Sequence, residues 1–301
     1  MDSSSDRPTN YIGVYLGGAK GKTTALSWLQ HTPNSPEATK CQVLFAKTRS
    51  PEESPWTDDV ILAWLDKNFS SSSTVIGISA PLTLPSCVRC AEESCPGVTQ
   101  CKVPSVDWLK NEAPLLIAAN LKQGGYLAYK SSGSNDEIYD PSPKPIGNIA
   151  PYARRCTEVF HQFQGHRISK DHIGNATGPI ATRGWHLTKQ LRTRNYKLNQ
   201  NLLEVSARGT IHAIFGEKTA AGYRKDADPW HTRAKILTHL ESKIQFSSRS
   251  GFSKEKVLQN DHAFDALIAA YSAYQAKSEH WPYQDISPWK EDGWIWLPPP
   301  S

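Results

Sequence analysis

Four cysteines lie close together in the sequence, at a spacing that suits a metal site. They are Cys87, Cys90, Cys95 and Cys101. Four thiolates in one loop can close tetrahedrally on Zn2+, which favours sulfur and has no geometric preference of its own. Four close cysteines also suit an iron–sulfur cluster, and free or disulfide-bonded thiols are the remaining alternative. Because all four positions would be protein ligands, we expect a structural rather than a catalytic site.

Two carboxylates, Asp261 and Asp265, stand four residues apart in an alanine-rich stretch. This spacing places both on one face of a helix. Glu204 lies in the apolar run Leu202–Val205, where a buried acid needs a cation or a hydrogen-bond donor. We therefore predict that these three acids are catalytic and hold a hard divalent cation, Mg2+ or Mn2+. The alternative is that the aspartates only offset the dipole of a helix N-terminus.

The positive charge of the chain is concentrated in one section. The net charge is +5 over 301 residues, but residues 144–200 contain ten basic and two acidic residues, which is +8, so the rest carries −3. Aromatic residues are interleaved with the charges, which favours single-stranded nucleic acid, DNA or RNA, as the partner. The alternative is a solvated basic face. The candidate phosphate contacts in this section are Arg154, Arg155, Arg192 and Arg194.

Residues 17–24 (GGAKGKTT) resemble a phosphate-binding loop but depart from it. Leu16 stands where the first glycine of a Walker A motif is required, and strands are predicted on both sides. We predict a hairpin turn from which Lys20 and Lys22 can contact a phosphate. The sequence around Ser79 lacks the second glycine of a nucleophile elbow motif, which argues against a serine hydrolase.

The elements that must position these residues alternate between strands and helices. This order, with an opening hairpin, predicts an α/β fold with a mixed sheet flanked by helices. Strands are predicted at 11–16, 23–29, 42–47, 75–78 and 201–205, with a terminal strand in GWIWLP. Helices are predicted at 57–69, 112–122, 151–164, 182–194, 207–215, 230–246 and 256–277.

Composition limits the class of protein. Hydrophobic residues make up 38% of the chain, which is enough for a core, and no apolar run approaches the roughly 20 residues of a membrane span. The polar start of the chain lacks the features of a secretory signal, so a cytoplasmic protein is expected. We predict a flexible segment at 1–10 and a single domain at 11–301. That domain would contain the cysteine insert at 86–106 and the basic helical section at 144–200.

Taken in order, these pieces resemble domain-of-unknown-function family 429, which is described as predicted nucleases with a ribonuclease H-like fold. The cysteine insert is similar to that of a subgroup. The resemblance runs from about Tyr11 to Pro298 and is carried by IGVYLGGAKGKTTAL, VIGISAPLTLP, YARRCTE, LLEVSARGTIHAIFG, DHAFDALIAAYSAY and GWIWLP.

The resemblance implies metal-dependent phosphodiester hydrolysis, with carboxylates from the first strand, a central strand and the last helix holding two cations. Tyr15 and Ser79 stand where two of those acids are expected. Glu204, Asp261 and Asp265 remain at matching positions, and Glu158 is a possible fourth. The hypotheses are a metal-dependent nuclease that holds one metal ion and a non-catalytic nucleic-acid-binding protein on the same fold. A third is an actin- or sugar-kinase-like ATPase, suggested by the hairpin, although its late glycine-rich motif is missing.

Overall fold

The computed structural model describes residues 9–299 except 19, 33–39, 50–52, 123–149, 165, 167, 169–177, 247–252 and 284–287. Most of the segment predicted to be flexible, residues 1–8, lies outside the described residues. The chain forms two compact units. Unit 1 comprises Met1–Leu82, Pro179–Tyr283 and Trp296–Ser301, and unit 2 comprises Thr83–Gly178 and Gln284–Ile295.

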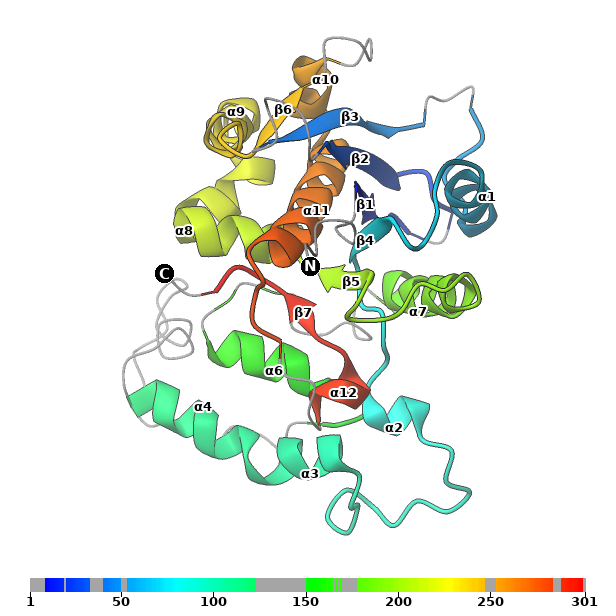
Figure 1. The fold of residues 1–301 in the computed structure, drawn as a ribbon. Coiled ribbons are helices and arrows are strands. Elements are labelled where there is room, and N and C mark those ends of the chain that lie inside the picture. Colours follow the sequence, from blue (N-terminus) through cyan, green and yellow to red (C-terminus); the bar gives the residue numbers. More distant parts are fainter. Residues whose placement is uncertain are drawn as a thin grey trace, which may run out of the picture. The chain divides into compact units, whose positions relative to one another are not determined.

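A seven-stranded mixed sheet is the centre of the fold, and helices flank it (Figure 1). Its strands lie in the order β6-β3-β2-β1-β4-β5-β7. β2 is antiparallel to β1 and β3, whereas β4 is parallel to β1 and β5, and β6 is parallel to β3. The predicted mixed α/β fold is thus confirmed. The strands are β1 (Asn10–Tyr15), β2 (Ala25–His31), β3 (Cys41–Thr48), β4 (Thr74–Ser79), β5 (Leu202–Val205), β6 (Ile244–Phe246) and β7 (Ile295–Trp296).

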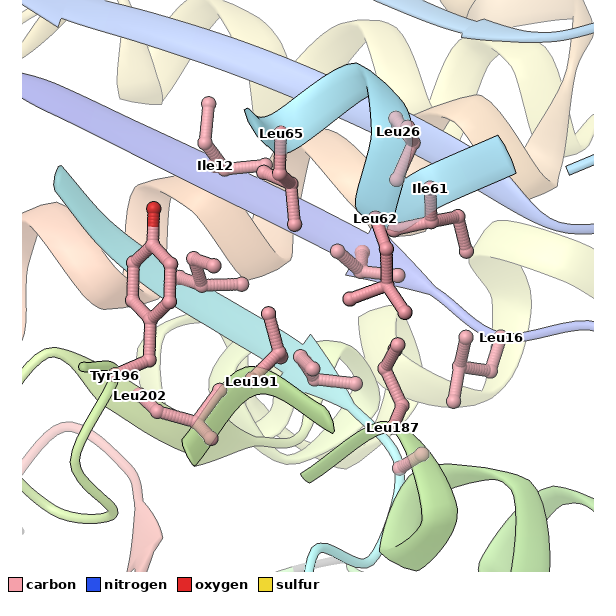
Figure 2. Packing of buried hydrophobic residues seen from close by; sticks show 14 of the residues in the cluster. Ile12, Leu16, Leu26, Ile61, Leu62, Leu65, Leu187, Leu191, Tyr196 and Leu202 are labelled. Carbon is pink, nitrogen blue, oxygen red and sulfur yellow. The ribbon is translucent and has the colours of Figure 1, made fainter. Parts of the chain in front are cut away.

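Helices α1 (Asp58–Asn68) and α7 (Gly178–Arg192) pack on one face of this sheet. Thr57, the first residue of the predicted helix 57–69, caps α1, because its side chain accepts from the backbone N–H of Val60. Alternate residues of the parallel strands meet both helices, and burying each such side chain contributes about 1.5–3 kcal/mol. Figure 2 labels ten members of this core: Ile12, Leu16, Leu26, Ile61, Leu62, Leu65, Leu187, Leu191, Tyr196 and Leu202.

Helix α11 (Asp261–Ser278) covers the opposite face of β1 and β4 at very short range. A Cβ atom added to Gly13 would lie 1.9 Å from the backbone oxygen of Ala266, and one added to Gly77 would lie 2.6 Å from that of Ala269. Glycine on the strands and alanine on the helix therefore permit this contact. The same side carries α8 (Ala207–Lys225), α9 (Pro229–Leu240) and α10 (Lys254–Gln259).

Three predicted helices differ from the structure. The predicted helix 256–277 is divided at Asn260, whose side chain accepts from the N–H groups of His262 and Ala263 and so starts α11. Gly216 has a φ of 80° and interrupts α8 where the predicted helix 207–215 ends, but a second helical segment follows it to Lys225. The end of predicted helix 230–246 is instead strand β6, which pairs with β3.

Unit 2 is built from short helices around a buried carboxylate. Asp292 is fully buried and accepts from the Ser86 hydroxyl, the Arg89 guanidinium and the backbone N–H of Cys156. The helices of unit 2 are α2 (Ser86–Arg89), α3 (Pro104–Asn111), α4 (Ala113–Lys122), α6 (Cys156–Phe163) and α12 (Trp289–Asp292). Within the described ranges, neither unit contains a helix long and apolar enough to cross a membrane.

Candidate functional site

The parallel strands β1 and β4 end side by side, at Tyr15 and Ser79. Both residues belong to the face covered by α11, because each stands two positions after a glycine that contacts that helix. The N-terminal end of α11 lies at the same edge, where His262 stacks on the Tyr15 ring at 5.1 Å. This edge of unit 1 therefore brings together the two neutral substitutions and the two aspartates that the sequence singled out.

Asp261 and Asp265 share one arginine, Arg224 of α8. The Arg224 Nη2 atom donates to Asp265 Oδ2, and its Nε atom lies 3.6 Å from Asp261 Oδ2. The guanidinium carbon is 5.2 Å from the Tyr15 ring centroid and 5.8 Å from that of Tyr223. One cation thus pairs with both acids and rests against two aromatic rings.

A second arginine adds positive charge to this group. Arg233 is buried on α9, where it donates to the backbone oxygens of Tyr223 and Leu258 at 3.0 and 2.5 Å. It interacts electrostatically with both Asp261 and Asp265. The pKa of Asp265 is raised to about 6, mainly by burial, against the opposing effect of Arg224.

Glu204 does not join the two aspartates, contrary to the sequence-based expectation. It pairs in register with Ile78 of β4, and neighbouring strands place paired residues on the same face. Ile78 belongs to the core under α1 and α7, so Glu204 lies on the face opposite α11. There Glu204 Oε2 accepts from the backbone N–H of Leu82 at 2.8 Å, which supplies a donor to the buried carboxylate.

The hairpin turn between β1 and β2 is held by Arg183 of α7. Its Nη1 atom donates to the Gly17 oxygen and the Thr24 hydroxyl at 3.0 and 2.6 Å, and its Nε atom pairs with Asp58 at 2.6 Å. Lys20 and Lys22 are exposed on this turn, as a phosphate contact would require. Beside it lies a surface depression of about 450 Å³, lined by Thr57, Asp58, Asp59, Pro179, Thr182, Arg183 and His186.

The predicted basic contacts divide into buried and exposed groups. Arg155 is 0% exposed and donates to Glu158 and to the Thr83 hydroxyl, so its role in this structure is to hold unit 2 together. Arg154 donates to Gln162, and Arg194 pairs with Asp66 at 2.9 Å. Arg192 is exposed.

Arg192 belongs to an exposed ridge along α7, which we call the α7 ridge: Thr182, Trp185, His186, Lys189 and Arg192. Helical spacing places these residues along one side of α7, and Trp185 alone among them is half-buried. The Lys189 Nζ atom lies 3.8 Å from the Trp185 ring centroid. Lys197 is exposed just beyond the end of the helix. The ridge thus combines an aromatic ring with cations.

The four cysteines of the predicted insert lie in unit 2. Cys90 and Cys95 are exposed, and Cys87 and Cys101 are half-buried. Burial raises the pKa of the Cys87 thiol, with further contributions from Cys101, Cys95 and Cys90, so each of these three lies within electrostatic range of Cys87. Among the described residues, however, no three or more His, Cys, Asp or Glu side chains are arranged closely enough to hold a metal ion.

Arg224 and Arg183 were not identified from the sequence. Arg224 meets Asp265 across 41 positions, and Arg183 meets Asp58 across 125, so no local spacing connects them. The hydrogen-bonding need of the buried Asp265 was the one signal that a cation had to be nearby.

The fold and this edge define a mixed α/β protein with two arginine-neutralised aspartates at the ends of its central strands. Residues 147–285 match the model of a family described as Protein of unknown function (DUF429). This match supports the membership in this family that the motifs predict. No curated protein and no solved structure matches the chain.

Proposed function

We propose that the protein binds single-stranded nucleic acid through the α7 ridge and does not hydrolyse it. The observation that carries the proposal is the placement of Lys189 over the Trp185 ring, with Arg192 on the same side of the helix. Bases stack on aromatic rings whatever their sequence, and neighbouring cations attract the phosphates. When a base approaches Trp185, Lys189 is positioned to turn from the ring to a phosphate.

The sheet supports a ribonuclease H-like fold as the framework for this activity. Strands β3, β2, β1, β4 and β5 lie in that order, and β2 runs opposite to β1, β4 and β5. This is the arrangement that the resemblance found in the sequence implies. Helix α7 lies between β4 and β5 in the chain, and it packs on the face of the sheet opposite α11.

Hydrolysis is the competing function, and the close pair Asp261 and Asp265 is the observation that favours it. The other acids that the mechanism requires are not at this edge. Tyr15 and Ser79 are neutral, and Glu204 is on the other face of the sheet. The Ser79 hydroxyl accepts from the Ala207 N–H at the start of α8 at 3.4 Å. Binding without cleavage is therefore the function that this arrangement supports best.

Fluorescence anisotropy with labelled single-stranded DNA and RNA tests the proposal. Each phosphate contact with a single strand contributes about 0.7 to the slope of log K against log salt. The double substitution K189Q/R192Q should therefore weaken binding and flatten the slope by up to about 1.4.

The control K243Q/K254Q removes the same charge from lysines that pair with Glu279 and Glu241. It should bind like the parent. Equal losses in both double variants would reduce the effect to net charge and overturn the assignment to the α7 ridge. Mg2+- or Mn2+-dependent cleavage of either strand by the parent would overturn the absence of hydrolysis.

We also propose that the cysteine loop binds Zn2+, with an iron–sulfur cluster as the alternative. Residues 91–100 are all exposed, so this loop has no buried side chains to fix its conformation. The chain contacts that hold it include the Lys110 amino group, which donates to the backbone oxygens of Thr99 and Cys101 at 3.3 Å. A small closure of the loop onto one ion would supply the missing constraint.

A further inference from the structure

Mg2+ or Mn2+ is the cofactor that the nuclease resemblance implies, and the residues at the edge of the sheet do not fit it. A divalent ion needs several oxygen ligands that are free to coordinate. Here Asp265 Oδ2 already accepts from Arg224, and Asp261 Oδ2 lies 3.6 Å from the same guanidinium, so Asp265 Oδ1 is the buried oxygen of the pair that has no partner among the described residues. Tyr15, at the end of the first strand, presents a ring face to that guanidinium in place of a carboxylate.

We infer that Arg224 is the built-in cation of this site, which takes the place of a divalent metal ion and keeps Asp261 and Asp265 from binding one. The inference does not depend on nucleic-acid binding, since it concerns the opposite face of the sheet from the α7 ridge.

The first support is the number of charges. Asp261 and Asp265 carry two negative charges, and Arg224 and Arg233 carry two positive charges within electrostatic range. The negative charges of the two acids are therefore balanced without a metal ion. An added divalent cation would be repelled by the two guanidinium groups.

The second support is that Arg224 is fixed in its position. An ion pair on an open surface is worth about 0–1 kcal/mol and exchanges readily with solvent ions. The Asp265 side chain is only 4% exposed, however, and the Arg224 guanidinium also contacts the Tyr15 and Tyr223 rings. Displacing it would leave a buried carboxylate without its partner, which is costly.

The third support is that Tyr15 and Arg224 depend on one another. Tyr15 stacks on His262 with an interplanar angle of 17°, so its ring contacts both that imidazole and the guanidinium. An acid at position 15 would pull Arg224 away from Asp265, whereas the tyrosine ring stabilises it without competing as a ligand. The neutral residue on the first strand and the arginine on α8 thus form one arrangement.

Mn2+ titration at pH 8, followed by the electron paramagnetic resonance signal of free Mn2+, tests the inference. The parent should show no saturable binding up to 1 mM. The variant R224Q keeps a polar side chain but removes the cation, and it should bind one Mn2+ at least tenfold more tightly than the parent. Adding D265N to R224Q should abolish that binding, which would assign the ion to the acid pair.

Two results would overturn the inference. One is a parent that binds Mn2+ as tightly as R224Q and loses it in D265N, because the site would then be open despite Arg224. The other is a folded R224Q, verified by circular dichroism, that binds no Mn2+, because Arg224 would then be only a structural ion pair. If R224Q does not fold, the thermal unfolding of the parent and of D265N is measured with and without Mn2+. A rise in the Tm of the parent with Mn2+ that is absent in D265N would contradict the inference.

Discussion

His161 is a titratable side chain that is buried, and burial disfavours its charged form. It is 3% exposed and is surrounded by the rings of Phe160, His166 and Trp294. Burial first, and His166 second, lower the pKa of His161 to about 3. The imidazole is therefore neutral in the folded protein at pH values well above 3.

This lowered pKa predicts a loss of stability in acid. The unfolded chain binds a proton on His161 near pH 6.5, whereas the folded chain does so only near pH 3. Stability is therefore complete above about pH 6.5 and falls as the pH decreases toward 3. Between pH 7 and 5 this one group should cost up to about 2 kcal/mol. Urea unfolding at both pH values should show a smaller pH dependence in H161Q.

The matched control is H231Q, which changes an exposed histidine on α9 and should keep the pH dependence of the parent. An H161Q variant that loses as much stability in acid as the parent would contradict the prediction.

The arginines show why the types of site residue were easier to predict than their roles. The sequence shows the basic section but not which of its arginines are buried. Arg155 donates to Thr83, 72 residues away in the sequence, and is fully buried, whereas Arg192 is exposed. The pair Asp261 and Asp265 followed from a helical spacing of four. Its partner Arg224 belongs to another helix, and nothing in the local sequence indicates their contact.

At the level of elements, the close packing of α11 on the sheet depends on two glycines in the strands. Gly13 and Gly77 pair in register on β1 and β4, and both contact the α11 backbone. This close contact also places Asp261 and Asp265 at the ends of those strands. A shift of α11 away from the sheet would move both aspartates relative to Tyr15.

The substitution G13A should be strongly destabilising. The added Cβ would lie 1.9 Å from the Ala266 oxygen and 2.4 Å from the Ala270 nitrogen, which are backbone atoms that cannot move alone. Overpacking of this kind costs about 1–3 kcal/mol or more. G18A is the control, because a Cβ there meets nothing within 4 Å. Chemical unfolding should show a much lower midpoint for G13A than for G18A, and similar midpoints would disprove the close packing.

The elements with the strongest local signals were predicted best. Thr57 with two following acids indicated the start of α1, and the β-branched run of β4 indicated a buried strand. The break at Asn260 was missed because the sequence on both sides favours a helix. Strand β6 was missed because its three residues become a strand only through pairing with β3.

At the scale of the molecule, the proposed chemistries are distributed over different units and faces. The α7 ridge lies on one face of the sheet in unit 1, and Asp261 and Asp265 with Arg224 lie on the other face. The cysteine loop belongs to unit 2. Each unit has its own buried core. Loss of one feature should therefore leave the others measurable, which allows each proposal to be tested in the full chain.

The cysteine loop offers the clearest test of this independence. If Cys87, Cys90, Cys95 and Cys101 bind one Zn2+, elemental analysis of the purified protein should find about one zinc per chain, and C90S should lose it. Because a structural metal contributes its binding free energy to folding, amides at residues 87–101 should exchange with deuterium much faster in C90S. Amides of β1 and β4 in unit 1 should exchange as in the parent.

The control C41A removes a buried thiol from β3 in unit 1 and should leave the zinc content unchanged. Iron and the visible absorption of a cluster in place of zinc would change the identity of the cofactor. A parent protein with neither metal, or a C90S variant that retains zinc, would show that these cysteines are not a metal site.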